Sequence, residues 1–239
     1  MASDDRPHPA ARDPRHFNRF DEVLALFKHL LQSSSYTRKS EIHAGMLAMA
    51  DREVIEDAND RVINALACGE RVWMTSDLHF NHAKIIGYCD RPYFSVEDMN
   101  AELLRLLTKV APAELLILVG DMAMGEFEGG LAKIRQIPGR KILVLGNHDL
   151  DRSGRCRLSG QRDDAGNPLF DAIVPFLFWP GPPGREVVVT HYPLVLQEGY
   201  RGLPILNYHG HLHRDVLAPT QQVKYMNVGW DVSYTLNCL

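Results

Sequence analysis

Four short polar blocks each follow a hydrophobic run along the chain, and a single histidine lies between the last two. They are Asp77-Leu78-His79, Gly120-Asp121, Gly146-Asn147-His148-Asp149 and Gly210-His211-Leu212-His213, with His191 following an apolar run at 187–189. Carboxylates, an amide and imidazoles gathered at strand ends are the ligands that a pair of divalent cations needs. Such a centre is suited to metal-assisted attack on a phosphate ester.

Each block alone carries little information about function. Asp77 and His79 are two residues apart, so in an extended backbone their side chains would point to the same side, as would those of His211 and His213. A Gly-Asp pair after a strand is a common turn, and a single histidine such as His191 is more often structural than a ligand. The conjunction decides the interpretation, because five of the 11 histidines fall in this ordered set.

In this order the blocks resemble the motifs of the metallophosphoesterase family, also called calcineurin-like phosphoesterases. That family is marked by an Asp-x-His, a Gly-Asp, a Gly-Asn-His-Asp/Glu, a single His and a Gly-His-x-His. The resemblance runs from Asp77 to His213, and no ligand position is missing. The first block with its flanks, Thr-Ser-Asp-Leu-His-Phe-Asn-His at 75–82, is similar to a branch of small, mostly bacterial or phage members.

The resemblance implies both a fold and two ligand sets. The fold would be of the α/β class, with two facing mixed β-sheets flanked by helices in an α/β/β/α sandwich. The first metal would bind Asp77, His79, Asp121 and His213, and the second would bind Asp121, Asn147, His191 and His211, so that Asp121 bridges the two. Oxygen and imidazole ligands without a thiolate suit Mn, Fe, Zn, Ni or Co.

The expected mechanism follows from this pair of metals. They would lower the pKa of a shared water, so a bridging hydroxide is the predicted nucleophile. By resemblance, His148 would protonate the leaving oxygen as a general acid, and Asp149 beside it would orient a neighbour or cap the loop. Substrate contacts are predicted for Asn147, His82 and Arg152, although a loop-stabilising role for His82 and a solvated position for Arg152 are open alternatives.

The elements that must position these blocks alternate between short β-rich runs and helical runs from residue 71 onward. Strands are predicted at 72–75, 115–119, 142–145, 187–190, 206–208 and 223–228, and helices at 95–110 and 131–136. This alternation is typical of an α/β sheet, whose ligands lie outside the carboxyl ends of the strands. The arginine-containing segment 151–168 is predicted to be a long loop.

The N-terminal part has a different pattern. Residues 1–15 have the composition of a tail, and apolar stripes at helical spacing predict helices at 16–32 and at about 46–67. We therefore expect two units, a tail with a helical extension at 1–70 and a catalytic domain at 71–239. The helices either pack on the catalytic domain or offer a surface for a homodimer or another partner.

Composition narrows the class of protein. Of the 239 residues 45% are hydrophobic and 23% are charged, as in an ordinary soluble globular protein. The formal net charge of −4 gives no basic field for nucleic acid, which is therefore not indicated as a partner. Four cysteines without a C-x-x-C pair indicate reduced thiols, and no apolar run is long enough to cross a membrane. A cytoplasmic location is predicted.

The sequence therefore predicts a binuclear metal-dependent hydrolase of phosphate esters. A phosphodiester or nucleotide-type substrate is favoured over the alternatives, a phosphomonoesterase or a protein phosphatase. A different class is a non-catalytic scaffold of the same fold that acts through its N-terminal helices. A metal-storage or sensing protein is the third alternative. The complete ligand set counts against the scaffold, and the presence of His148 counts against a storage or sensing protein.

Overall fold

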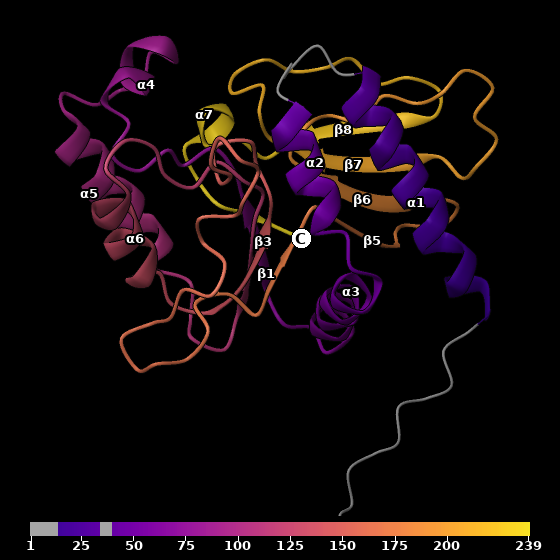
Figure 1. The fold of residues 1–239 in the computed structure, drawn as a ribbon, viewed down its shortest axis with the longest axis horizontal. Coiled ribbons are helices and arrows are strands. Elements are labelled where there is room, and N and C mark those ends of the chain that lie inside the picture. Colours follow the sequence, from indigo (N-terminus) through magenta and orange to yellow (C-terminus); the bar gives the residue numbers. More distant parts are fainter. Residues whose placement is uncertain (1–13, 34–39) are drawn as a thin grey trace, which may run out of the picture.

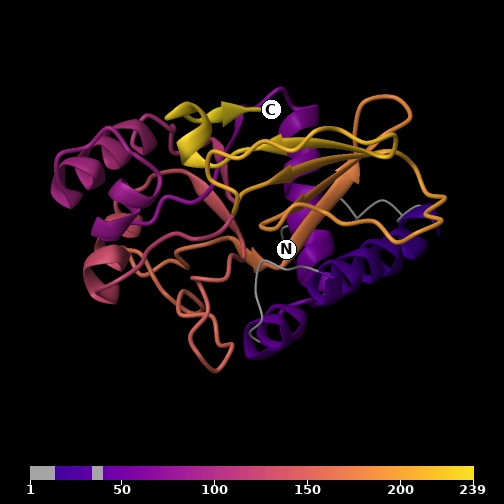
Figure 2. The same cartoon turned by 90° about the horizontal axis from the view of Figure 1, so that it is seen from above.

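The computed structural model describes residues 14–33 and 40–239, and it contains two β-sheets with helices on their outer sides (Figure 1). The first sheet has the order β4-β3-β2-β1-β9 and the second the order β5-β6-β7-β8. Viewed at 90°, the two sheets lie between two groups of helices (Figure 2). The predicted α/β/β/α sandwich is therefore confirmed.

The first sheet is mostly parallel. Its strands are β1 (Val72–Thr75), β2 (Leu115–Leu118), β3 (Arg140–Val144), β4 (Ala172–Val174) and β9 (Asn237–Cys238). The first four run parallel to one another, and β9 pairs antiparallel with β1 at the edge. Every residue of β2 is buried, as expected for a strand of a parallel sheet that is covered on both faces. The carboxyl ends of β1, β2 and β3 therefore meet at one edge.

The second sheet brings three more strand ends together. Its strands are β5 (Phe176–Pro180), β6 (Glu186–Thr190), β7 (Ile205–His209) and β8 (Val223–Asn227). β6, β7 and β8 are parallel, whereas β5 is antiparallel to β6.

Short buried strands such as β4 and β5 were not predicted, because neither carries a polar alternation or a motif at its end.

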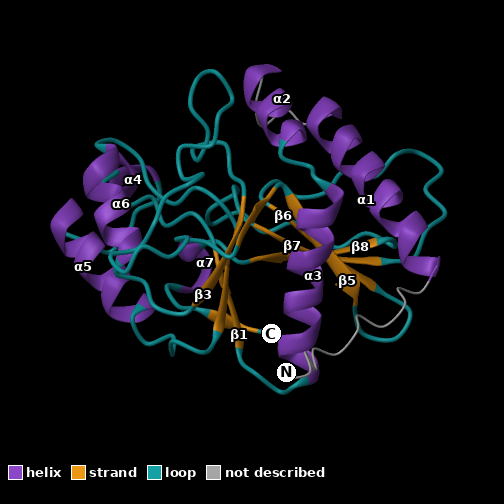
Figure 3. Ribbon diagram, turned by 60° about the horizontal axis from the view of Figure 1, so that its bottom comes forward, coloured by secondary structure: helices purple, strands orange, loops and turns teal. Residues whose placement is uncertain are grey.

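The helices cover the outer faces of the sandwich (Figure 3). On the side of the first sheet lie α4 (Ala83–Tyr88), α5 (Val96–Leu107) and α6 (Phe127–Arg135), and on the side of the second sheet lie α1 (Pro14–Ser33) and α2 (Ser40–Ala48). Helix α3 (Arg52–Ala67) lies between these groups and contacts β1 and β4 of the first sheet as well as β5 of the second. The short helix α7 (Trp230–Ser233) follows β8. The predicted α5 is confirmed, and Ser95 caps it by accepting a hydrogen bond from the Asp98 amide at 3.1 Å.

The N-terminal helices pack on the sheets, α1 on the second sheet and α3 on strands of both. The rings of Phe20 and Phe27 in α1 lie 6.0 and 5.2 Å from that of Phe176 in β5. In α3, the Asn59 side chain accepts a hydrogen bond from the Phe178 amide at 2.9 Å. One hydrophobic core thus runs from α1 through both sheets. Packing on the two sheets accounts for these apolar stripes, and homodimerisation through them stays a prediction.

The helix predicted at about 46–67 is in fact two helices. α2 ends at Ala48, and α3 begins after Asp51, whose carboxylate accepts a hydrogen bond from the Val54 amide at 3.2 Å. Aspartate at this position satisfies an amide that has no partner within the helix, and so favours a new start. The predicted tail at 1–15 lies almost entirely outside the described residues.

Two further expectations concern the loop at 151–168 and membrane-spanning helices. Between β3 and β4, segment 151–168 has no helix or strand, only isolated bridges such as Leu150 with Cys156, so the predicted loop is confirmed. In the part of the chain that the structure describes, no helix is both long and apolar enough to pass through a bilayer.

Candidate metal centre

The predicted ligands all follow the carboxyl ends of parallel strands, and they come from both sheets. Asp77 and His79 follow β1, Asp121 follows β2, Asn147 follows β3, His191 follows β6, and His211 and His213 follow β7. Strand ends of the two sheets converge here, so residues up to 136 positions apart in the chain become neighbours. The loops position the side chains, while the strands hold the loops.

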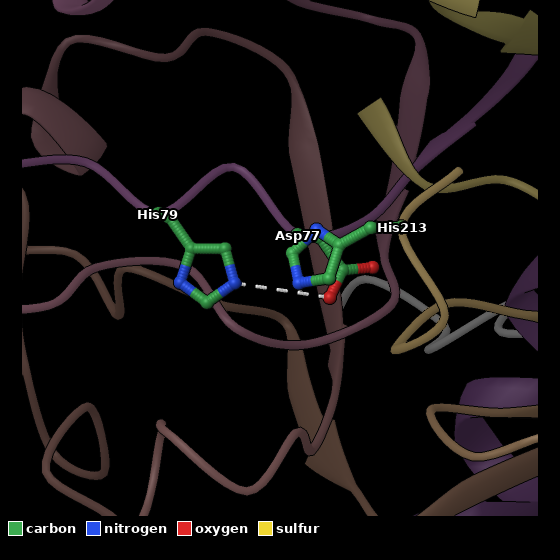
Figure 4. Close-up of side chains that lie close together, drawn as sticks. All are labelled: Asp77, His79 and His213. Carbon is green, nitrogen blue, oxygen red and sulfur yellow. Dashed lines mark ion pairs between the residues drawn. The ribbon is translucent and has the colours of Figure 1, made fainter. Parts of the chain in front are cut away.

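Asp77, His79 and His213 form the first group of ligand atoms, here called the first trio (Figure 4). One ligand atom from each lies within 4.8 Å of the others. His79 Nε2 is 3.9 Å from Asp77 Oδ1, and the rings of His79 and His213 stack with centroids 5.3 Å apart. The side chains of Asp77 and His79 are almost wholly buried. This spacing suits one cation between three ligands.

Asp121, His191 and His211 form the second trio, again with ligand atoms within 4.8 Å of one another. His191 Nε2 lies 3.4 Å from Asp121 Oδ2. His79 Nε2, from the first trio, lies 3.7 Å from the same oxygen. Asp121 therefore faces both groups, which is the position that a bridging carboxylate requires.

The backbone at these ligands is unusual. Among the described residues, eight that are not glycine have a positive φ, and five of them are Asp77, His79, Asp121, His211 and His213. Such angles are uncommon for residues with a side chain and are concentrated at functional sites. The sequence argument that these pairs converge from an extended backbone is thus wrong. They converge because each turns through the left-handed region.

Several buried polar atoms of the centre have no hydrogen-bond partner. They are both ring nitrogens of His79, Nε2 of His191, Oδ1 of Asp77 and Oδ1 of Asn147. Leaving a buried polar group unpaired costs about 1–3 kcal/mol, so a group of such atoms needs an explanation. Divalent cations would satisfy Nε2 of His79, which faces Asp77 and Asp121, and the orphaned atoms of the other three residues. The residues present therefore fit the metals that the resemblance implies.

The histidines of the centre differ in protonation. Against the effect of burial, hydrogen-bonded carboxylates raise the pKa of His191 to about 9 and that of His213 to about 10, so these two rings would lose a proton when a cation binds. Burial lowers the pKa of His79 well below its usual value, and burial together with the His191 charge lowers that of His211 to about 3. Both rings are thus neutral, the form that can bind a metal. Burial alone would raise the pKa of Asp121, but the charge and hydrogen bond of His191, together with the charges of His148 and His79, outweigh it and hold the carboxylate ionised. The ionised carboxylate attracts positive charge.

Hydrogen bonds fix the orientation of two of the histidines. His191 Nδ1 is 2.8 Å from the Val119 carbonyl oxygen, which leaves Nε2 facing Asp121. His213 Nδ1 is 2.7 Å from Asp231 Oδ2, and Asp231 in turn forms a buried ion pair with Arg91 at 2.7 Å. Such partners are typical of metal-binding histidines. Sequence reasoning missed Arg91 and Asp231, because neither lies within a motif.

His148 and Asp149 occupy different environments. The His148 side chain is 36% exposed, its Nε2 lies 4.0 Å from Asp121 Oδ2, and its amide donates to Asp121 Oδ1. Asp149 is buried and accepts hydrogen bonds from the amides of Asp121, Met122 and Gly146 at 2.8–3.0 Å. Asp149 thus holds the loops after β2 and β3 together, which favours the orienting role over a direct catalytic one.

His82 and Arg152, two of the candidates for substrate contact, lie in different surroundings. A cavity of about 760 Å³ adjoins the centre and is lined by His82 as well as by His79, His148 and His213. Arg152 is exposed and is not among its lining residues. The loop that carries Arg152 packs elsewhere, since Gly154 lies against the backbone of Glu41 in α2. A substrate contact by Arg152 stays a prediction.

Comparisons with known proteins agree with this geometry. The family model described as calcineurin-like phosphoesterase matches residues 70–235. The uncharacterised protein MJ1445 of Methanocaldococcus jannaschii is 33% identical over 82 residues, and this match spans 33% of the chain and only 47% of that relative's length. The gene 66 protein of Mycobacterium phage D29 is 28% identical over 185 residues, which cover 69% of the chain and 90% of the phage protein.

A solved structure shares the fold. The protein AQ665 from Aquifex aeolicus, described as of unknown function, superposes with a TM-score of 0.50 at 22% identity. The similarity covers 71% of this chain and 95% of that one, and at this identity it shows the fold alone.

Proposed function

Because the chain belongs to the calcineurin-like phosphoesterase family, we propose that it is a phosphoesterase with a binuclear metal centre at the strand ends of its two sheets. One observation carries the proposal. The two trios approach each other at Asp121, and Asp77 Oδ1, both ring nitrogens of His79 and His191 Nε2 are buried there without a hydrogen-bond partner. A scaffold protein would gain nothing from leaving these groups unpaired.

The ligands divide as the motifs indicate. We assign Asp77, His79, Asp121 and His213 to one cation and Asp121, Asn147, His191 and His211 to the other. When bound, two divalent cations supply Lewis acidity, which activates water and neutralises charge on the phosphoryl oxygens. The chain's part is to fix the ligand positions, with Asp231 and the Val119 carbonyl oxygen holding the histidine rings.

His148 is the proton donor in this proposal. Its ring is not needed as a ligand, it lines the cavity, and its amide is anchored to Asp121 beside both trios. A partly exposed imidazole can take a proton from solvent and deliver it from Nε2 to the leaving oxygen. Neighbouring Asn147 would contact both a cation and the substrate, and His82 would contact the substrate from the cavity wall.

A phosphodiester or nucleotide-type substrate is favoured by the size of the cavity. A space of about 760 Å³ is within the range of sites that hold a whole small molecule, and is far more than a phosphate group fills. The four cysteines are all free, which supports a reducing, cytoplasmic location. A phosphomonoesterase remains the alternative that the assay below distinguishes.

The test is a metal-reconstituted activity assay. Metal-free protein is loaded in turn with Mn, Fe, Ni, Zn, Co or Mg and given bis(p-nitrophenyl) phosphate, p-nitrophenyl phosphate and nucleotides. We expect turnover with at least one transition metal and two bound ions per chain by mass spectrometry. Asp121→Asn should lower both, whereas Asp164→Asn, an exposed loop variant, should lower neither. Two bound ions without turnover of any ester would overturn the proposal.

A further inference from the structure

The cavity beside the centre is not symmetric with respect to the two trios. It is lined by His79 and His213 of the first trio and by His148, but by no member of the second trio. Its remaining lining comes chiefly from the first turns after β1 and from the loop after His213. The space therefore opens on the side where the proposed proton donor stands.

This placement decides which part of an ester would lie there. A general acid must be within hydrogen-bond reach of the oxygen that it protonates. The group attached to that oxygen, which is the leaving group, must then extend past His148 into the adjoining space. The leaving group would therefore lie in this cavity, and the side chains that line it indicate which kind of leaving group fits.

One wall of the cavity, here called the α4 wall, consists of His82, Lys84, Ile85 and Tyr88. Tyr88 is 72% exposed, and its ring stands edge-on to that of His82 with centroids 6.3 Å apart. Ile85, which also lines the cavity, is buried and apolar. An aromatic ring that is exposed within a partly apolar cavity offers a face on which a flat ring can stack.

The rest of the lining suits a ligand with both apolar and polar parts. Met124 and Leu212 add apolar surface, and Arg214 and Asp215 add polar groups farther along the chain from His213. A nucleoside combines a planar base with a hydroxyl-bearing sugar and so matches this mixture. Stacking of a base on an aromatic side chain does not depend on which base is present.

We propose that the α4 wall binds the leaving group of the ester and that this leaving group is a nucleoside whose base stacks on Tyr88. The inference rests on the proposed function, because the direction of the leaving group is set by His148. It adds a specificity-determining residue that lies outside every ligand motif. Since Tyr88 packs little against the protein, its substitution leaves the fold intact.

A matched pair of substrates tests the inference. Adenosine 5′-phosphate and ribose 5-phosphate release the same primary alcohol oxygen and differ by the base, and their methyl esters form the corresponding diester pair. We expect the metal-loaded protein to favour the adenosine compound at least tenfold in kcat/KM. Tyr88→Ala should remove about tenfold of this preference and leave ribose ester hydrolysis unchanged, whereas Tyr88→Trp should retain the preference.

The matched control is Phe94→Ala, which removes a fully exposed aromatic ring that, unlike Tyr88, does not line the cavity. Adenosine binding to the metal-loaded protein, measured by calorimetry, gives a second readout that needs no turnover. Ester hydrolysis without preference for the base, or equal losses on both substrates in Tyr88→Ala, would overturn the inference alone. Absence of all turnover would overturn the proposed function, and unchanged adenosine binding in Tyr88→Ala would then reject the stacking site as well.

Discussion

At the scale of single residues, the contact between His213 and Asp231 has the clearest consequence. The carboxylate holds Nδ1 of the ring, so Nε2 is the atom that remains for a cation, and Arg91 keeps the carboxylate in place. Arg91 also donates to the Asp77 carbonyl oxygen at 2.6 Å, so one buried guanidinium supports two members of the first trio.

We predict that Asp231→Ala weakens metal binding by about 10–100-fold, as is usual for the loss of a carboxylate that orients a ligand histidine. The measurement is chelator competition on the folded protein, with circular dichroism to verify the fold. Asp231→Asn keeps an acceptor for His213 and should lose less. An affinity equal to that of the exposed loop variant Asp164→Ala would show that Asp231 does not support the centre.

The second residue prediction concerns His148. Its replacement by alanine should slow alkyl phosphate esters by roughly 10²–10⁴-fold, because a poor leaving group needs a proton. p-Nitrophenyl esters should slow much less, since p-nitrophenolate leaves without one. The ratio of the two kcat values, at equal metal content, is the measurement. Equal losses on both esters would reject the proton-donor role.

The sequence predicted the ligand residues by type and order, but not the way in which they converge. Their blocks are local in the chain, so they could be recognised without a structure. The left-handed backbone at Asp77 and His79 leaves no such local mark. Arg91 and Asp231 are 140 residues apart, and only the folded chain shows that they are partners.

At the scale of elements, the loops after β1 and β7 approach so closely that a glycine is required between them. A Cβ atom on Gly210 would overlap the Ser76 hydroxyl and lie 2.5 Å from Asp77 Oδ2. The same carboxylate oxygen accepts a hydrogen bond from the His211 amide at 2.9 Å. The closeness of the two loops thus holds Asp77 in place from the other sheet.

We predict that Gly210→Ala lowers metal content and activity at least tenfold, because the added methyl group must displace Asp77 or separate the loops. Metal stoichiometry and kcat are measured together, with thermal melting to follow stability. Gly87→Ala is the control, since no atom lies within 4 Å of a Cβ there and the residue is inside α4. Retention of two ions in Gly210→Ala would contradict the argument.

Long periodic elements were predicted better than short ones. The stripe of α5 and its cap at Ser95 were visible in the sequence, whereas α4 has only six residues and no side-chain cap. The break between α2 and α3 was missed although Asp51 marks it, because the apolar stripe continues across the break. The proposed leaving-group cavity depends on α4, so this omission also hid the cavity.

At the scale of the whole molecule, the centre places two aspartates in the interior. Asp77 and Asp121 are both buried, and each raises the energy of ionising the other. Cations would relieve this repulsion only in the folded state, so binding must stabilise the fold.

Metal removal should therefore lower the melting temperature. Metal at 100 times its Kd adds about 2.7 kcal/mol, which for a chain of this length is a shift of roughly 5–10 °C. Differential scanning fluorimetry with and without a chelator measures it. Asp121→Asn should show a smaller shift on metal addition than the unmodified protein, and an equal shift in both would place the bound ions elsewhere.

The sandwich itself followed from the motifs by resemblance, whereas the place of the N-terminal helices did not. An apolar stripe on a helix indicates that this face is buried, but it does not identify the element that packs against it. The structure supplies the answer in Phe20 and Phe27, which lie on Phe176, and in Asn59, which bonds to β5. The boundary proposed at residue 70 thus crosses a continuous core.

Each trio takes ligands from both sheets: Asp77 and His79 with His213 in one, and Asp121 with His191 and His211 in the other. Each cation would consequently link the two sheets of the sandwich. A substitution that disturbs packing far from the cavity, even under α1, would then change the distance between the ligands of the first sheet and those of the second. The number of metal ions bound per chain would therefore report whether the two sheets are correctly packed against each other.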